Sequence, residues 1–163
     1  MGVTTSSSRS KRTAVRSATE YRLLRVDILH DCGKSLNPAI DSGQIEGGFI
    51  QGAGWLTSEE LWWNDEGELE THAPSTYKIP TCSDLPVDFR VEMLESAANR
   101  EETIHRSKAV GEPPLMLSLS VFHAIRDAIA SVADYRSIPA LAAPATPEAV
   151  LNAIDALQRG AAA

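Results

Sequence analysis

The sequence predicts an α+β domain, and three stretches carry this prediction. Leu24, Val26 and Ile28 alternate with polar residues, the period-two pattern of a strand with one buried face. Two longer stretches, residues 39–56 and 113–132, place apolar residues at helical spacing. At 163 residues the chain is long enough to form one domain with a hydrophobic core. A mixture of short strands and helices therefore defines the expected fold class.

Composition and charge argue against several classes of partner. Hydrophobic residues make up 43% of the chain and charged residues 23%, which is ordinary for a globular protein. The net charge of −7 argues against nucleic acid or an anionic membrane as the main partner, because both need basic surfaces. No apolar run is long enough to cross a bilayer. Residues 1–19 lack the apolar segment of a secretory signal, and we expect them to form a disordered tail.

The cysteines and the end of the first strand give no metal or disulfide pattern. Cys32 and Cys82 form neither a close pair nor a dense framework, so we expect a reduced, cytoplasmic location. The strand is followed by His30, Asp31 and Cys32, three residue types that bind metals. Neighbouring strand residues point to opposite faces, so we expect no metal site there.

The first helix is expected to begin at Asn37 and Pro38, a capping residue followed by a first-turn proline. Ile45, Phe49 and Leu56 lie at helical spacing and are expected to form its buried stripe. The helix also contains five glycines, each of which costs up to about 1 kcal/mol relative to alanine. Something must therefore pack against this bare backbone.

A second face of this helix aligns Gln44, Gly48 and Gln51. Two interpretations remain open. The glycine backbone can allow close packing of another helix, or it can form the floor of a groove for a flat polar ligand. The two amides flanking the glycine can each donate and accept hydrogen bonds.

The middle of the chain predicts a hairpin and another strand. Residues 57–63 and 68–72 flank a turn at Asn64–Gly67. Residues 87–94 predict a strand with one apolar face, formed by Val87, Phe89, Val91 and Met93.

Two helices are expected in the last third of the chain. The first runs from Pro113 to about Val132, and its expected buried stripe is Val121, Phe122, Ile125, Ala128, Ile129 and Val132. After a small-residue linker, Thr146 caps a final amphipathic helix that runs through Leu157.

Glu112 is the strongest candidate for a catalytic residue. It stands between Gly111 and two prolines, and Pro113 is expected to keep it extended just before the helix begins. A carboxylate held at the start of a helix, with little backbone freedom, suits a general base. The alternative is that Glu112 only complements the helix dipole, an interaction that contributes about 0.3–1 kcal/mol.

Four strings in the chain resemble one known family. The string KAVGEPPL, residues 108–115, resembles the C-terminal signature of the molybdenum hydroxylases, the xanthine dehydrogenase/aldehyde oxidase family. The resemblance is closest to the molybdenum subunit of bacterial xanthine dehydrogenase. The string LNPAIDSGQIEGGF, residues 36–49, is similar to the family's second molybdopterin-binding region, and residues 71–80 and 143–148 also match.

The resemblance implies roles for three residues. Glu112 would be the catalytic base, and Gln44 would contact the pterin together with Gly111. We expect the helix that begins near Pro113 to pack on the helix from Pro38, so that Glu112 and Gln44 face one cavity.

The resemblance also implies a reaction. The family enzyme hydroxylates hypoxanthine and xanthine towards urate, a step of purine catabolism, and passes the electrons through iron–sulfur centres and flavin to NAD. The 2Fe–2S, FAD and NAD sites are expected on other domains or subunits. An aldehyde substrate is one alternative, and a non-catalytic structural remnant of such a subunit is another.

The resemblance extends from about residue 20 to residue 157 and covers the last part of a longer subunit. We expect a tail at 1–19, a partial molybdopterin-binding domain at 20–136, and a linker and helix at 137–163. The expected partners of the chain are an upstream part of the molybdenum subunit, an iron–sulfur/flavin subunit and the purine substrate. The isolated chain is expected to be inactive.

Overall fold

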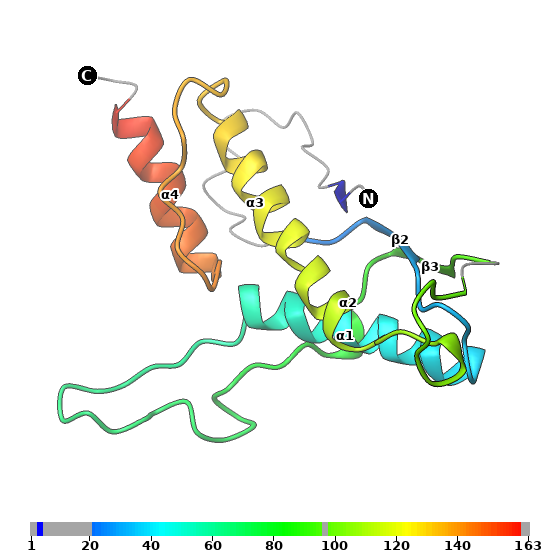
Figure 1. Ribbon diagram of the computed structural model, residues 1–163. Helices are drawn as coiled ribbons and strands as arrows, with labels where there is room; N and C mark the ends of the chain where they lie inside the picture. The colour runs from blue at the N-terminus through cyan, green and yellow to red at the C-terminus, as the bar shows by residue number, and fades with distance from the viewer. Residues whose placement is uncertain (1–2, 5–20, 96–97, 161–163) are drawn as a thin grey trace.

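The computed structural model describes residues 3–4, 21–95 and 98–160, which form an α+β fold as predicted (Figure 1). The elements follow one another as β1 (Val3–Thr4), β2 (Arg25–His30), α1 (Pro38–Thr57), β3 (Asp88–Met93), α2 (Glu112–Leu117), α3 (Leu119–Ser131) and α4 (Pro147–Gly160). Short 3₁₀ turns lie at Cys82–Asp84 and Ile104–Arg106.

The strands form one small sheet in the order β1-β2-β3. β2 and β3 are parallel over their whole length, from Arg25 opposite Asp88 to His30 opposite Met93. Parallel neighbours need a crossover, which α1 and the segment after it supply. β1 pairs antiparallel with the start of β2. Within the expected tail of residues 1–19, only residues 3–4 belong to the described part, and there they form β1.

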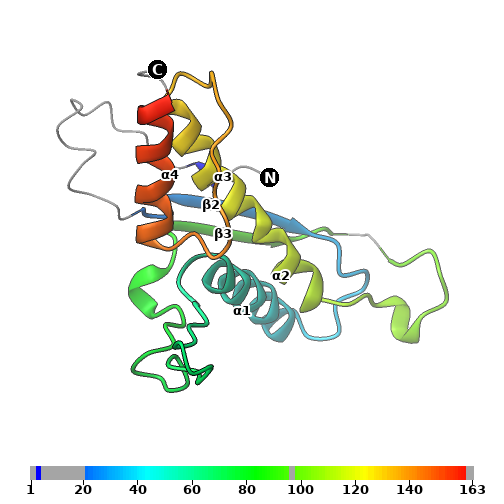
Figure 2. The same cartoon turned by 90° about the vertical axis from the view of Figure 1, so that its left-hand side faces the viewer.

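The helices cover one face of the sheet, as the two views show together (Figures 1 and 2). Val26 and Ile28 of β2 point into the core, where they join Ile45 and Phe49 of α1. The opposite face of the sheet carries charged residues, and Arg25 pairs there with Asp27 and Asp88. The predicted alternation is thus confirmed for Val26 and Ile28, whereas Leu24 precedes β2 and is only half-buried.

The cap and the buried stripe of α1 are also confirmed. The Asn37 side chain accepts a hydrogen bond from the main-chain N–H of Ile40 at 3.4 Å, and Pro38 occupies the first turn. Ile45, Phe49 and Leu56 are buried. The expected stripe fixes which face of α1 meets the sheet and α3.

The region after Gly111 differs from the prediction in two ways. Glu112 is the first residue of α2 and not an extended residue before it. A following proline disfavours the helical region without forbidding it, and the N–H of Leu115 still reaches the carbonyl of Gly111 at 3.4 Å. The expected single helix is broken at Ser118, where two successive hydrogen bonds span only three residues: Ser118 to Leu115 and Val121 to Ser118.

The buried stripe of α3 follows the prediction except at its end. Val121, Ile125 and Ile129 are buried, and Phe122 and Ala128 are half-buried. Val132 is exposed because it lies just beyond the last residue of α3.

The predicted hairpin is reduced to a turn and one bridge. The N–H of Asn64 donates to the Glu68 carbonyl, Gly67 has a φ of +82°, and Trp63 pairs with Leu69. No strand forms on either side within this described segment, because no second layer covers it. Residues 58–80 instead form an arm that extends away from the helices (Figure 1).

The strand predicted at residues 87–94 and the last helix are confirmed with shifted ends. β3 begins at Asp88, so Val87 lies outside it and is exposed. Thr146 caps α4 by accepting from the N–H of Ala149 at 3.2 Å, and α4 continues to Gly160. None of the helices in the described ranges is long and apolar enough to cross a membrane.

Candidate functional site

The site is built on a close contact between α1 and α2. A Cβ atom on Gly48 would lie 2.8 Å from the carbonyl oxygen of Gly111. A Cβ atom on Gly52 would collide with the carbonyl oxygen of Leu115 and would lie 2.7 Å from the Oγ of Ser118. Real Cβ atoms do not approach other atoms so closely, so only glycine fits at these two positions. The close-packing interpretation holds for this part of the glycine face.

Ser118 fixes this contact from the side of α2. It is fully buried at the junction of α2 and α3, and its Oγ donates to the main-chain carbonyl of Phe49 at 2.5 Å. The Ser118 hydroxyl therefore gives a main-chain carbonyl of α1 a hydrogen-bond donor, and the same bond holds the end of α2 on α1.

The three candidate residues lie together at the start of α2. The Oε1 atom of Gln44 lies 3.8 Å from the position that a Cβ atom on Gly111 would occupy. Glu112 follows at once as the first residue of α2. Among the described residues, no hydrogen bond or ion pair engages its carboxylate. The site thus places the Gln44 amide beside Gly111, the residue that directly precedes Glu112.

The expected cavity around Gln44 and Glu112 is not found. Both side chains are exposed, so the described residues do not enclose them. The reason is that α2 packs directly on the glycines of α1 and leaves no space between the two helices. The side chains of Gln44, on α1, and Glu112, at the start of α2, are instead both open to solvent.

An open strip remains on α1 beside its contact with α2. Cβ atoms on Gly43 and Gly47 would meet nothing within 4 Å. Gln44 and Gln51 flank this bare backbone and are exposed. A groove for a ligand is therefore not available at Gly48, which α2 covers, but it is available at this strip. A flat polar group can approach the helix closely here and bond to either amide, so the residues present fit a pterin.

The segment that leads to Glu112 is tied to the end of β2. The N–H of Lys108 donates to the Cys32 carbonyl at 2.8 Å, and Gly33 and Ser107 form an isolated bridge. The Lys108 ammonium also lies 2.5 Å from Asp31. The hydrogen bond from Lys108, together with one from the N–H of Gly33, holds the pKa of the Asp31 carboxyl below its usual value.

These ties give the residues after β2 a role that the sequence did not reveal. His30 is buried and Asp31 is exposed, so their side chains diverge as the strand geometry predicts. Sequence analysis missed this role because it depends on pairing between residues 31–34 and 106–109, which are far apart in the chain and leave no local pattern.

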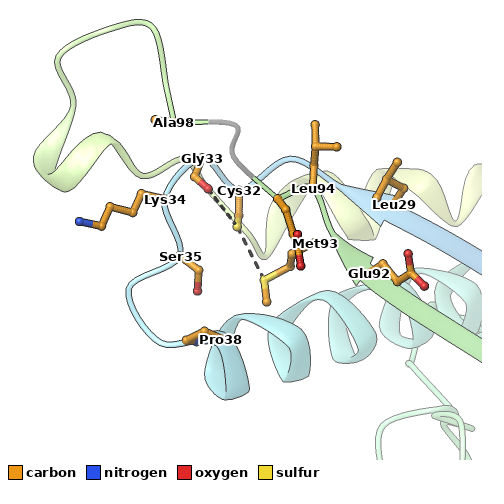
Figure 3. A pocket seen from close by; sticks show the side chains of 11 residues that line it. Leu29, Cys32, Gly33, Lys34, Ser35, Pro38, Glu92, Met93, Leu94 and Ala98 are labelled. Atoms are coloured by element: carbon orange, nitrogen blue, oxygen red, sulfur yellow. Dashed lines mark hydrogen bonds between the residues drawn. The ribbon is translucent and has the colours of Figure 1, made fainter.

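A separate hollow of about 810 Å³ lies where β2 and β3 end and α1 begins (Figure 3). Cys32 and Met93 are among its lining residues, and the Cys32 thiol lies 3.7 Å from the Met93 sulfur. Burial raises the pKa of this thiol. Glu112, Gln44 and Gly111 do not line the hollow. It is therefore distinct from the candidate site.

Comparisons with known proteins assign the domain. Residues 16–86 match the family model described as molybdopterin cofactor-binding domain. The xanthine dehydrogenase/oxidase of Mus musculus is 49% identical over 140 residues, which are 82% of this chain and 10% of that protein. The indole-3-acetaldehyde oxidase of Arabidopsis thaliana is 50% identical over 110 residues, which are 68% of this chain and 8% of that protein.

Solved structures agree with the sequence relatives. The quinoline 2-oxidoreductase of Pseudomonas putida 86 has a TM-score of 0.72 and 31% identity, over 83% of this chain and 16% of that one. The aldehyde oxidoreductase of Desulfovibrio gigas has a TM-score of 0.61 and 26% identity, over 84% of this chain and 14% of that one.

Fold and sequence together define part of a molybdopterin-binding unit. The chain belongs to the xanthine dehydrogenase/aldehyde oxidase family and corresponds to a portion of its molybdenum-binding region. It spans about a tenth of the length of the curated relatives it matches.

Proposed function

We propose that this chain supplies the catalytic base and one wall of the molybdopterin site in a molybdenum hydroxylase of the xanthine dehydrogenase type. Glu112 is the base, and Gln44 and Gly111 contact the cofactor. The observation that carries the proposal is that the Oε1 atom of Gln44 lies 3.8 Å from the Cβ position of Gly111, directly before Glu112, where α2 packs on the glycines of α1.

Each residue has a defined task in this proposal. Bound molybdopterin would supply a molybdenum centre that delivers oxygen to the substrate and takes up two electrons. The Gln44 amide bonds to the polar edge of the pterin, and Gly111 leaves room for it. The Glu112 carboxylate accepts the proton released during the oxygen transfer. Ser118 and the glycine contact hold α2, which begins with Glu112, on α1, which carries Gln44.

The proposed substrate is hypoxanthine or xanthine, because xanthine dehydrogenases of several organisms are 45–50% identical to this chain. An aldehyde is the second candidate. The indole-3-acetaldehyde oxidase of Arabidopsis thaliana supports it, at 50% identity over a shorter stretch. Iron–sulfur and flavin centres in other parts of the assembly would carry the electrons away.

The test is to purify the chain alone and together with the upstream part of the molybdenum subunit and an iron–sulfur/flavin subunit. Molybdenum content and substrate-dependent dye reduction are measured with xanthine and with indole-3-acetaldehyde. We expect the chain alone to hold no molybdenum, because Gln44 and Glu112 are exposed and small-molecule sites are enclosed. The assembly should hold molybdenum and oxidise xanthine faster than the aldehyde.

Three other results would count against parts of the proposal. Stoichiometric molybdenum in the chain alone, with xanthine-dependent dye reduction, would contradict the expected division of the site. Faster oxidation of the aldehyde would replace the purine by the second substrate. A molybdenum-loaded assembly that oxidises neither compound would favour a structural remnant.

A further inference from the structure

His30 is a buried polar residue to which the proposed chemistry assigns no task. It is the last residue of β2, and only 6% of it is exposed. Its side chain points to the core-facing side of the sheet, on the same face as Val26 and Ile28. The Nε2 atom lies 3.3 Å from the main-chain carbonyl oxygen of Ala109. Ala109 precedes Glu112 by three residues.

The chemistry of this contact fixes which of its two atoms donates the hydrogen bond. A carbonyl oxygen can only accept a hydrogen bond, so Nε2 must carry the hydrogen and donate it. Because His30 is buried, losing this hydrogen bond would cost free energy, since a polar ring nitrogen would be left out of water without a partner.

We propose that His30 is a positioning residue for Glu112, which it holds in place through the carbonyl of Ala109. This inference rests on the proposed role of Glu112 as the base. His30 acts on the main chain that carries the base and touches neither substrate nor cofactor.

The neighbouring hydrogen bonds show which part of the segment before Glu112 is left for His30 to hold. The bonds from Lys34 to Arg106 and from Lys108 to Cys32 fix the segment up to residue 108. Residues 109–111 then cross from the end of β2 to α2. On the sheet side the carbonyl of Ala109 meets His30, and on the helix side the carbonyl of Gly111 meets Gly48. Among the hydrogen bonds of the described residues that join this segment to the end of β2, the one from His30 lies closest in sequence to Glu112.

The first test needs no variant. The full chain is prepared with ¹⁵N-labelled histidine, and the protonation of each ring nitrogen is read by nuclear magnetic resonance. We expect Nε2 of His30 to carry a hydrogen that exchanges slowly with water. A bare Nε2, or one whose hydrogen exchanges as fast as that of the exposed His123, would overturn the proposal.

The second test uses variants in the assembled enzyme. His30→Leu removes the donor and keeps an apolar side chain in the core, whereas His30→Gln keeps an N–H donor on a side chain that can still reach the carbonyl. His123→Leu, at an exposed histidine of α3, is the matched control. Amide hydrogen exchange is followed in a peptide covering residues 105–115, alongside kcat and KM.

In His30→Leu we expect exchange in this peptide to rise by about fivefold, the effect of losing one hydrogen bond. We expect kcat to fall by about 10- to 100-fold with KM unchanged, since small displacements of a base have effects of this size. His30→Gln should recover most of both, and the control should match the wild type. Unchanged exchange in His30→Leu, or no recovery with glutamine, would overturn the proposal.

The exchange and resonance data are independent of turnover. They separate failure of the positioning role from failure of Glu112 as the base. If His30→Leu does not fold, the ring protonation and the comparison of His30→Gln with the wild type still decide the question.

Discussion

Two regions next to α1 differ in how their side chains are packed. One is the contact between α1 and α2, and the other is the arm of residues 58–80. At the contact, Gly48 and Gly52 carry no side chain at all, and main-chain atoms of the facing segment come within van der Waals distance. In the arm, large apolar residues remain in solvent: Leu61 is 53% exposed, Trp62 58% and Trp63 52%.

The difference shows that burial depends on a facing surface and not on hydrophobicity alone. α2 fits the glycine face of α1 closely, and this fit places Glu112. The arm is closed at its base, where the Ser58 hydroxyl donates to the Lys78 carbonyl at 2.8 Å and the Tyr77 hydroxyl donates to Glu59 at 2.7 Å. Beyond its base nothing in the described ranges covers the exposed aromatics. Exposed apolar groups of this kind are typical of interaction surfaces.

The largest effect on stability is expected at the glycine contact. In Gly52→Ala the new Cβ atom would collide with the Leu115 carbonyl and with Ser118, so α2 must move. We expect a loss of roughly 1–3 kcal/mol in the free energy of unfolding by urea. Gly47→Ala is the matched control, because a Cβ atom there meets nothing and alanine favours the helix by about 0.5–1 kcal/mol. Equal effects of the two substitutions would show that the close contact does not exist.

A much smaller effect is expected in the arm. Trp62→Ser removes an exposed aromatic side chain, so the free energy of unfolding should change by less than about 0.5 kcal/mol. Aggregation of the isolated chain, followed by light scattering, should decrease because less apolar surface is exposed. A loss of several kcal/mol would mean that the arm packs on the domain and that the two regions are alike.

The smallest expected effect concerns the tie between Asp31 and Lys108. Because the pKa of Asp31 is lowered in the folded state, its contribution to stability is present above the ordinary carboxyl pKa. That contribution is lost as the pH falls through the lowered value. In Lys108→Met the hydrogen bond that is the main cause of the shift is gone, so acid should destabilise the variant less steeply than the wild type. Parallel unfolding curves against pH would show that the tie is unimportant.

Local patterns predicted the elements that depend on local chemistry. The alternation around Val26, the Asn37 cap and the Thr146 cap all appear in the structure as expected. The packing of α2 on α1, which brings the Oε1 atom of Gln44 to 3.8 Å from the Cβ position of Gly111, was predicted only through the resemblance to a family, because no periodicity links residues so far apart.

The errors share a physical cause, which is packing between distant segments. Ser118 breaks the expected long helix because its hydroxyl and backbone adapt to α1. The hairpin around Asn64 forms no strands because no layer lies beneath it. The expected cavity is missing because α2 fills the space over Gly48. Each outcome depends on what faces the segment, which a single sequence does not display.

The most direct test of the account is the turnover of the assembled enzyme with Glu112→Gln. Glutamine cannot accept a proton, so we expect kcat to fall by about 10² to 10⁴-fold while molybdenum content stays near that of the wild type. Glu148→Gln, which replaces an exposed acid in the first turn of α4, controls for a general helix-dipole effect and should leave turnover unchanged. Near-normal turnover of Glu112→Gln with full molybdenum content would contradict the role of Glu112 as the base.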